Sequence, residues 1–243
     1  MSLHSNSLFH FTKKEHLLNI LRNNFIPHYC KERLSIPGVD FDYWIPMVSF
    51  CDIPLSQIKE HIAEYGKYAI GLNKEWVNKN KLNPVLYYKE GSCFFEKYYK
   101  LLESMRKKAV GWTTQTQKTF LEDYYDAKYL FSFFKPYIGY DFKTQKEKIF
   151  YDEREWRYVP DSLPEDSYMI PDRDERLQRM QKEVEQNELY FKPNDISYIV
   201  IENEDERLEF VKNLRKIKSK YSPQDVEILI TKIISSEQIL SDI

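Results

Sequence analysis

Short apolar segments recur along the 243-residue chain, each bounded by polar or turn-forming residues. None approaches the ~20 consecutive apolar residues of a membrane-spanning helix, so a transmembrane protein is not expected. Segments this short have the length of buried strands. The predicted strands are residues 8–11, 45–51, 68–72, 84–88, 148–151, 153–159, 196–201 and 226–230.

Helical patterns alternate with these strands. Thr12 is predicted to cap a first helix, and Glu15 three residues later would complete a capping box. A second helix is predicted to end at Gly66, and Asn73 is predicted to cap a short third helix. Apolar residues at helical spacing predict a further helix over 208–217.

Residues 93–135 show helical rather than strand periodicity, with many aromatic side chains. These aromatics favour packing between two helices, although a base-stacking surface is the alternative. The polar stretch 161–190 predicts a loop and a solvated helix. The sequence therefore predicts a single α+β domain over residues 1–243, with a mixed sheet and a helical insertion at about 93–135.

Composition excludes several functional classes. Lys and Arg total 36 against 38 Asp and Glu, a net charge of -2, which argues against strong non-specific binding to duplex nucleic acid. Only 6 glycines are present, and no phosphate-binding glycine loop occurs. The three cysteines and five histidines lack metal-ligand spacing, so no metal is expected. The N-terminus lacks a secretory pattern, and a cytoplasmic protein is predicted.

The segment Glu153-Arg154-Glu155-Trp156-Arg157 carries the densest candidate chemistry. On a strand, Glu153, Glu155 and Arg157 would share one face, with the carboxylates ~7 Å apart. Such a pair could stabilise a developing cation and accept a proton. The alternative is a solvent-facing strand whose Glu–Arg pairs serve only solubility.

His10 is the second candidate, because it lies in an apolar strand just before a predicted helix N-terminus. It is either a ligand-binding group or a partly buried structural histidine. Ser49 lies outside any nucleophile-elbow motif, so a serine hydrolase is not supported. Cys51 has no histidine partner by spacing, and a buried thiol is expected.

Several of these motifs, in this order, resemble the AbiGi family of bacterial abortive-infection proteins. The resemblance spans roughly residues 8–230 and is strongest over 8–90. It is carried by residues 8–12, 45–56, 68–76 and 153–157. The family is described as the antitoxin half of a two-protein phage-defence system, which implies a cognate toxin as partner.

A broader and less specific resemblance is to ADP-ribosyltransferase-like folds, including the DarT and PARP groups. It rests on His10-Phe11-Thr12, on Ser49-Phe50 at a strand edge, and on the Glu153 and Glu155 pair. The resemblance implies an ADP-ribosyltransferase-like sheet and NAD as substrate. Tyr65 is a candidate for the aromatic residue that stacks on nicotinamide.

The resemblance also implies a role for each residue. His10 would bind the ribose, Thr12 or the following helix start would place NAD, and Glu155 would hold the 2′-hydroxyl. Glu153 would orient an acceptor that could be protein or nucleic acid. Arg157 would meet a phosphate or pair with the glutamates. The alternative function is a non-catalytic antitoxin or binding module that acts by contact with a toxin.

Overall fold

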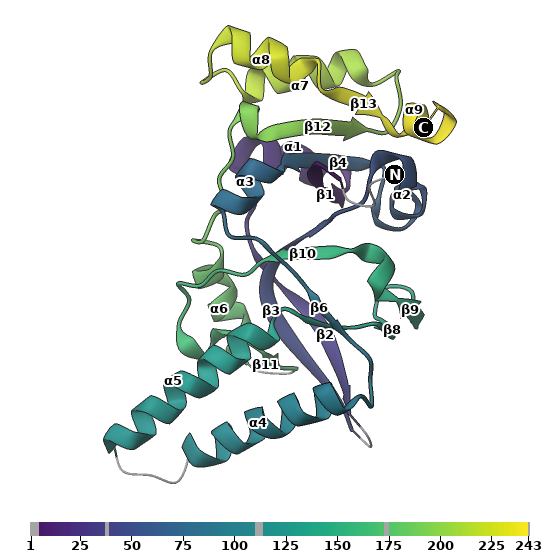
Figure 1. Cartoon of the computed structure of the whole chain (residues 1–243). Coiled ribbons are helices and arrows are strands. Elements are labelled where there is room, and N and C mark those ends of the chain that lie inside the picture. Colours follow the sequence, from purple (N-terminus) through teal and green to yellow (C-terminus); the bar gives the residue numbers. More distant parts are fainter. Residues whose placement is uncertain (1–4, 37–38, 110–113, 173–174, 243) are drawn as a thin grey trace.

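The computed structural model describes residues 5–36, 39–109, 114–172 and 175–242, and a mixed sheet runs through it (Figure 1). The strand order is β13-β12-β4-β1-β3-β10-β5, antiparallel except for the β12–β13 pair. The bounds are β1 Ser7–Thr12, β3 Val39–Cys51, β4 Tyr68–Asn73, β5 Asn83–Pro84, β10 Glu155–Tyr158, β12 Ile196–Ile201 and β13 Ile233–Ser235. The predicted α+β class with a mixed sheet is confirmed.

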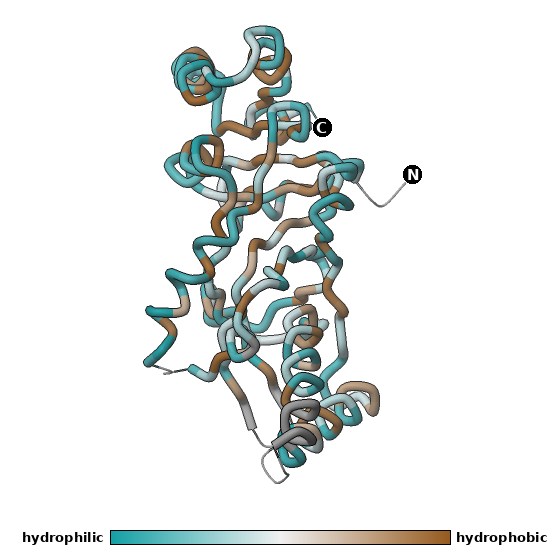
Figure 2. Tube along the Cα trace, turned by 90° about the vertical axis from the view of Figure 1, so that its left-hand side faces the viewer, coloured by the Kyte–Doolittle hydropathy of each residue, from teal (hydrophilic) through white to brown (hydrophobic). Residues whose placement is uncertain are grey.

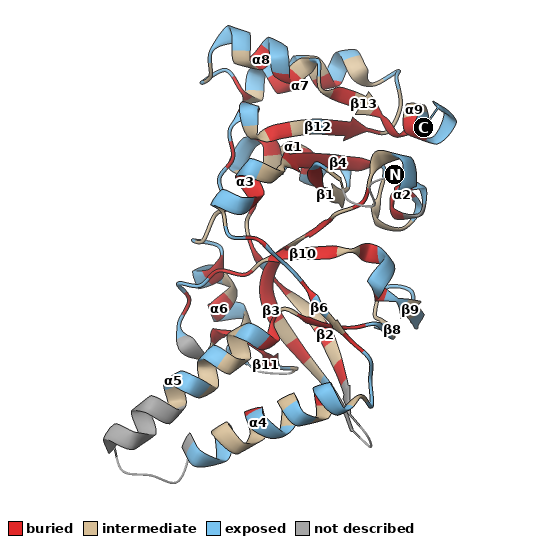
Figure 3. Ribbon diagram, viewed as in Figure 1, coloured by how far each residue is buried: buried red, intermediate tan, exposed pale blue. Residues whose placement is uncertain are grey.

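Helices cover both faces of this sheet. On one face lie α1 Lys14–Asn23, α3 Lys74–Lys79, α7 Arg207–Ile217 and α8 Pro223–Ile230, whose apolar residues join the largest core. On the other face lie α2 Lys59–Tyr65 and α9 Ser236–Asp242, which pack on a smaller core around Phe9 and Val200. Figure 2 shows hydrophobic residues concentrated along the strands, and Figure 3 shows these strands buried.

The long strand β3 extends past β1 and β10 and joins two parts of the molecule. Its last residues pair with β1 and β10, whereas its earlier residues pair with β2 His28–Ile36 and with β11 Ile170–Pro171. The β2–β3 hairpin packs against α6 Leu177–Val184 and the helical insertion to form a second core. The strand β2 was not predicted, because charged residues interrupt its apolar pattern.

The predicted helical insertion consists of α4 Cys93–Ala109 and α5 Thr114–Phe131. Its ends meet at the parallel pair of β6 Leu86–Tyr88 and β7 Phe134–Pro136. The aromatic side chains pack between the two helices, as where the rings of Tyr98 on α4 and Phe131 on α5 have centroids 5.5 Å apart. The interpretation as helix packing therefore fits the described residues better than a base-stacking surface.

Two predictions about helix starts and strands are wrong. Residues 226–230 belong to helix α8, where Ser222 accepts a hydrogen bond from the Asp225 amide and Pro223 occupies the first turn. Thr12 does not cap α1, because β1 continues through Thr12 and Lys13 is the N-cap, without a side-chain bond. Asn73 does cap α3, by accepting from the Trp76 amide at 2.8 Å.

The chain between residues 138 and 158 also differs from expectation. β8 Ile138–Asp141 and β9 Lys146–Ile149 form a separate hairpin, and 3-10 turn η2 Phe150–Glu153 follows. Arg154 adopts a left-handed conformation at φ 45°, so the strand predicted over 153–159 begins only at Glu155. Other short 3-10 turns are η1 Leu55–Gln57, η3 Glu165–Ser167 and η4 Pro193–Asp195. No helix among the described residues is long and apolar enough to cross a membrane.

Candidate functional site

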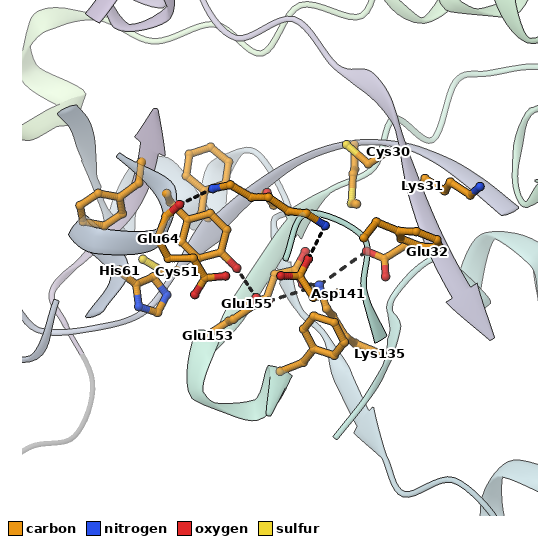
Figure 4. Close-up of a pocket in the computed structure, with 18 of the residues that line it drawn as sticks. Cys30, Lys31, Glu32, Cys51, His61, Glu64, Lys135, Asp141, Glu153 and Glu155 are labelled. Carbon is orange, nitrogen blue, oxygen red and sulfur yellow. Dashed lines mark hydrogen bonds and ion pairs between the residues drawn. The ribbon is translucent and has the colours of Figure 1, made fainter. Parts of the chain in front are cut away.

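A cavity of about 310 Å³ lies where the sheet meets the β2–β3 hairpin. Residues from β1, β2, β3, α2, β7 and η2 line it, together with the first residue of β10 and the tip of the β8–β9 hairpin. Figure 4 shows carboxylates, lysines and cysteines from these separate elements around one space. We call this space the pocket.

The pocket gathers most of the residues that the sequence singled out. His10, Ser49, Phe50, Tyr65, Glu153 and Glu155 all line it, although they come from four distant segments. Thr12 is not among the lining residues, although it lies on the same face of β1 as His10. Arg157 is also not among them, because its side chain is fully buried behind Glu155. Arg157 was expected either to contact a phosphate or to pair with the glutamates, and in the structure it pairs with Glu155 and Glu32.

The turn at Arg154 determines how the two glutamates reach the pocket. Glu153 ends η2 and Glu155 begins β10, so they do not share a strand face as predicted. The left-handed residue between them nevertheless brings both carboxylates to the same lysine. Both residues are buried, at 8% and 5% exposure, so a solvent-facing strand is excluded.

Arg157 holds Glu155 from behind. Its Nε donates to Glu155 Oε1 at 2.7 Å and its Nη2 to Oε2 at 3.2 Å, a two-point contact. Nη2 also donates to Glu32 Oε1 at 2.8 Å, and Nη1 to the Ser132 carbonyl at 2.6 Å. Every described partner of this guanidinium is an acceptor, which satisfies a cation that no solvent reaches.

Lys135 of β7 bridges three carboxylates inside the pocket (Figure 4). Its Nζ lies 2.8 Å from Glu155 Oε2, 3.2 Å from Glu153 Oε2 and 3.6 Å from Glu32 Oε1. Burial opposes the charge of Lys135, but the three carboxylates outweigh it and raise the lysine pKa well above its usual range. Lys135 is therefore a permanent cation.

The charge state of Glu155 follows from the same contacts. Burial raises the pKa of a carboxyl, but Arg157 and Lys135 outweigh this effect and lower the pKa of Glu155 to about 2. The carboxylate is thus ionised at neutral pH while shielded from water. It can accept a hydrogen bond or face a positive charge, but it cannot act as a general acid.

A second set of contacts surrounds Glu153. Tyr65 donates its hydroxyl proton to Glu153 Oε1, and Lys148 Nζ lies 2.7 Å from the same oxygen. Lys148 also contacts Glu64 and donates to the Tyr65 hydroxyl at 2.6 Å. Burial and then the charge of Glu153 raise the pKa of Tyr65, so its phenol stays protonated. The ring of Tyr65 thus lines the pocket, and its hydroxyl contacts Glu153 and Lys148.

His10 approaches the pocket from β1. Its Nδ1 lies 2.8 Å from the Ser49 carbonyl, which can only accept, so Nδ1 carries the proton. Burial lowers the pKa of His10, and the neutral ring then leaves Nε2 as an acceptor. Phe25 and Phe50 pack edge-on to the imidazole and fix its plane. His10 is consequently a preorganised hydrogen-bond acceptor.

The β8–β9 hairpin covers part of the pocket. At its tip, Phe142 lies under the cations of Lys31 and Arg33, at 4.9 and 5.0 Å from its ring centroid. On the α2 side, Lys143 contacts the Glu64 carbonyl and lies 5.2 Å from the Tyr65 ring centroid. The cover is therefore held by cation–π and polar contacts on both sides.

Sequence reasoning missed Glu32, Lys135, Lys148 and Glu64. A lysine within the aromatic run Phe133-Phe134-Lys135 was the one available signal, since buried lysines need carboxylate partners. Within the described ranges, no group of three or more potential ligands could hold a metal ion. The pocket is a site of paired charges and aromatic rings.

Comparisons with known proteins identify the relatives of this chain. A family model described as "Putative abortive phage resistance protein AbiGi, antitoxin" matches residues 23–202. The "Abortive phage resistance protein AbiGi" of Lactococcus lactis subsp. cremoris is 28% identical over 253 aligned residues, which cover 90% of this chain and 99% of the relative. No solved structure matches. The residues matched by the family model include the four glutamates that line the pocket.

Proposed function

The chain belongs to the AbiGi family of abortive phage resistance proteins, and from this premise we propose that it is an NAD-dependent ADP-ribosyltransferase of anti-phage defence. The observation that carries the proposal is the convergence of His10, Tyr65 and Glu155 on one pocket. These residues lie on three separate elements, β1, α2 and β10. A protein that used this fold only as a structural framework would not need them to meet in one pocket. Ser49 and Phe50 complete the wall between them.

The proposed reaction breaks the bond between ribose C1′ and the nicotinamide nitrogen. Nicotinamide leaves as a neutral molecule with the bonding electrons, and positive charge develops on the ribose. The buried carboxylate of Glu155 binds the 2′-hydroxyl and opposes this charge where no water screens it. The acceptor then bonds to C1′ and releases its proton to Glu153.

The remaining contacts position NAD. Nε2 of His10 accepts a hydrogen bond from a ribose hydroxyl, because Nδ1 is committed to the Ser49 carbonyl. The ring of Tyr65 stacks on nicotinamide. Thr12 and the start of α1 stay candidates for the far side of the dinucleotide, outside the pocket lining. The acceptor is a protein or a nucleic acid.

The test measures nicotinamide release from NAD by purified protein, with cell extract as acceptor. Glu155→Gln keeps the size of the side chain but removes the charge, and it should lower turnover by roughly 10²-fold or more. Glu147→Gln makes the same change at an exposed carboxylate on β9, so it is the matched control and should retain wild-type turnover. Equal turnover in wild type and Glu155→Gln would contradict the proposal.

A contact-only antitoxin is the second candidate, because the family description names an antitoxin. The pairing of Glu155 with Arg157 and Lys135 also suits a structural role for the glutamate. This candidate predicts no NAD turnover by any form of the protein. It also predicts a stoichiometric complex with one partner protein from the bacterial host, which survives Glu155→Gln.

A further inference from the structure

The charged groups deep in the pocket do not balance. Three buried carboxylates, Glu32, Glu153 and Glu155, face two buried cations, Lys135 and Arg157. When all five are ionised, one negative charge remains. The adjoining pair of Lys148 with Glu64 adds one charge of each sign and leaves this excess unchanged.

An unbalanced buried charge is costly unless something compensates it. Glu32 is the carboxylate without a cation to itself. Arg157 makes its two-point contact with Glu155, and Lys135 lies nearer to Glu155 and Glu153 than to Glu32. The stability of the fold does not require a third buried carboxylate here. Nor does it require that this carboxylate come from the β2–β3 hairpin.

We propose that Glu32 is a positioning and specificity residue of the pocket, which keeps one negative charge available for a ligand whose reacting part is cationic. Glu32 Oε1 lies 2.8 Å from Arg157 Nη2 and 3.6 Å from Lys135 Nζ. Through these contacts it partly neutralises the two cations that would otherwise neutralise Glu155. The ligand class, a dinucleotide with a cationic ring, rests on the proposed function. The charge of the pocket does not.

Cys30 offers a probe of this charge that needs no nucleotide. It lines the pocket two residues before Glu32 on the same face of β2. Burial raises the pKa of its thiol to about 11, with the charge of Glu32 as the next cause, so the thiol senses this carboxylate. Its reaction rates with a cationic and an anionic reagent report the local potential.

The experiment uses full-length protein carrying Cys93→Ser, which removes the exposed thiol of α4. Cys30 is labelled with trimethylammonium-ethyl or sulfonato-ethyl methanethiosulfonate, and peptide mass spectrometry confirms the labelled residue. The ratio of the cationic to the anionic rate should exceed one. Glu32→Gln should lower this ratio by roughly threefold to tenfold, whereas Glu147→Gln should change it less than twofold.

A second variant, with the opposite expected effect on the labelling ratio, keeps the test valid if the first variant misfolds. Lys135→Met removes a cation and should raise the ratio, so the proposal can be tested even where Glu32→Gln does not fold. Circular dichroism and thermal melting identify folded variants. A ratio unchanged in the folded variants of both residues would overturn the proposal, because an ionised Glu32 that faces the pocket must contribute to the potential at Cys30.

Binding of NAD⁺ and NADH separates this inference from the proposed function. The two differ in the charge of the ring, and Glu32→Gln should reduce the preference for the cationic form. If the labelling ratio shifts as expected but neither nucleotide binds, the role of Glu32 in setting the charge of the pocket is supported. The same result would overturn both the NAD function and the dinucleotide as ligand. Turnover of NAD with an unchanged labelling ratio would sustain the function and overturn the role of Glu32.

Discussion

Arg157→Met should destabilise the protein more than most single substitutions. The change removes a fully buried cation and leaves Glu155, Glu32 and the Ser132 carbonyl without their shared donor. A lowering of the Glu155 pKa from 4.5 to about 2 corresponds to about 3 kcal/mol, which Arg157 shares with Lys135. Removal of one partner from a buried ion pair costs about 3–5 kcal/mol. We therefore expect a loss of about 3 kcal/mol in the free energy of unfolding at pH 7.

The loss should depend on pH, with a sign fixed by Glu155. Its folded pKa lies below its unfolded value, so its ionisation stabilises the wild type above about pH 4.5, and this contribution is lost as the pH falls towards 2. Without Arg157, burial is opposed by Lys135 alone, so the pKa of Glu155 rises above its wild-type value and the carboxyl protonates more readily in the folded variant. The difference between wild type and variant should therefore shrink between pH 7 and pH 4.

Urea unfolding followed by the fluorescence of the four tryptophans measures both quantities. Arg215→Met serves as control, because Arg215 forms an exposed pair with Glu227 and should leave the midpoint unchanged. A loss below about 1 kcal/mol at pH 7, or an equal loss at both pH values, would refute the argument that Arg157 holds an ionised, buried Glu155.

Other predictions concern the scaffold. Asn73→Ala should lower the free energy of unfolding by about 1 kcal/mol in urea titration, because the Trp76 amide loses its cap. Gly66→Ala should lower the melting temperature sharply, because φ is 124° and a Cβ would strike the Thr12 carbonyl. Burial lowers the pKa of Lys218 to about 8, so Lys218→Met should be more stable than wild type at pH 7. Urea titrations should show this advantage fading as the pH rises from about 8 to 10.5, where the unfolded wild type binds the extra proton.

Strands buried on both faces were predictable, because burial demands a continuous apolar run. Residues 68–72 and 199–201 are such runs, and both lie in interior strands of the sheet. The same rule failed at 226–230, since a run this short also fits a buried helix and the Ser222-Pro223 start decides the outcome. Strand β2 escaped prediction because Lys31 and Glu32 on it are balanced by partners far away in sequence, Asp172 and Arg157.

The site divides in a similar way. His10 and Glu155 belong to short local motifs that the sequence displays, and Tyr65 is a candidate only through the resemblance to ADP-ribosyltransferase-like folds. Glu32 and Lys135 are meaningful only together, and more than a hundred positions separate them. A lone carboxylate on a charged strand carries no local signal that it will be buried. Only the folded chain assembles this part of the pocket.

The order of elements along the chain bears on biosynthesis. Every charged group of the pocket precedes residue 158, yet β4 obtains its outer neighbour only from β12 at residues 196–201. The core beneath β1 likewise takes residues from α7 and α8. A nascent or truncated chain that stops near residue 160 would contain every charged residue of the pocket. It would lack the strands and helices that complete the sheet around them. The growing polypeptide therefore gains its pocket only when its last third has been translated.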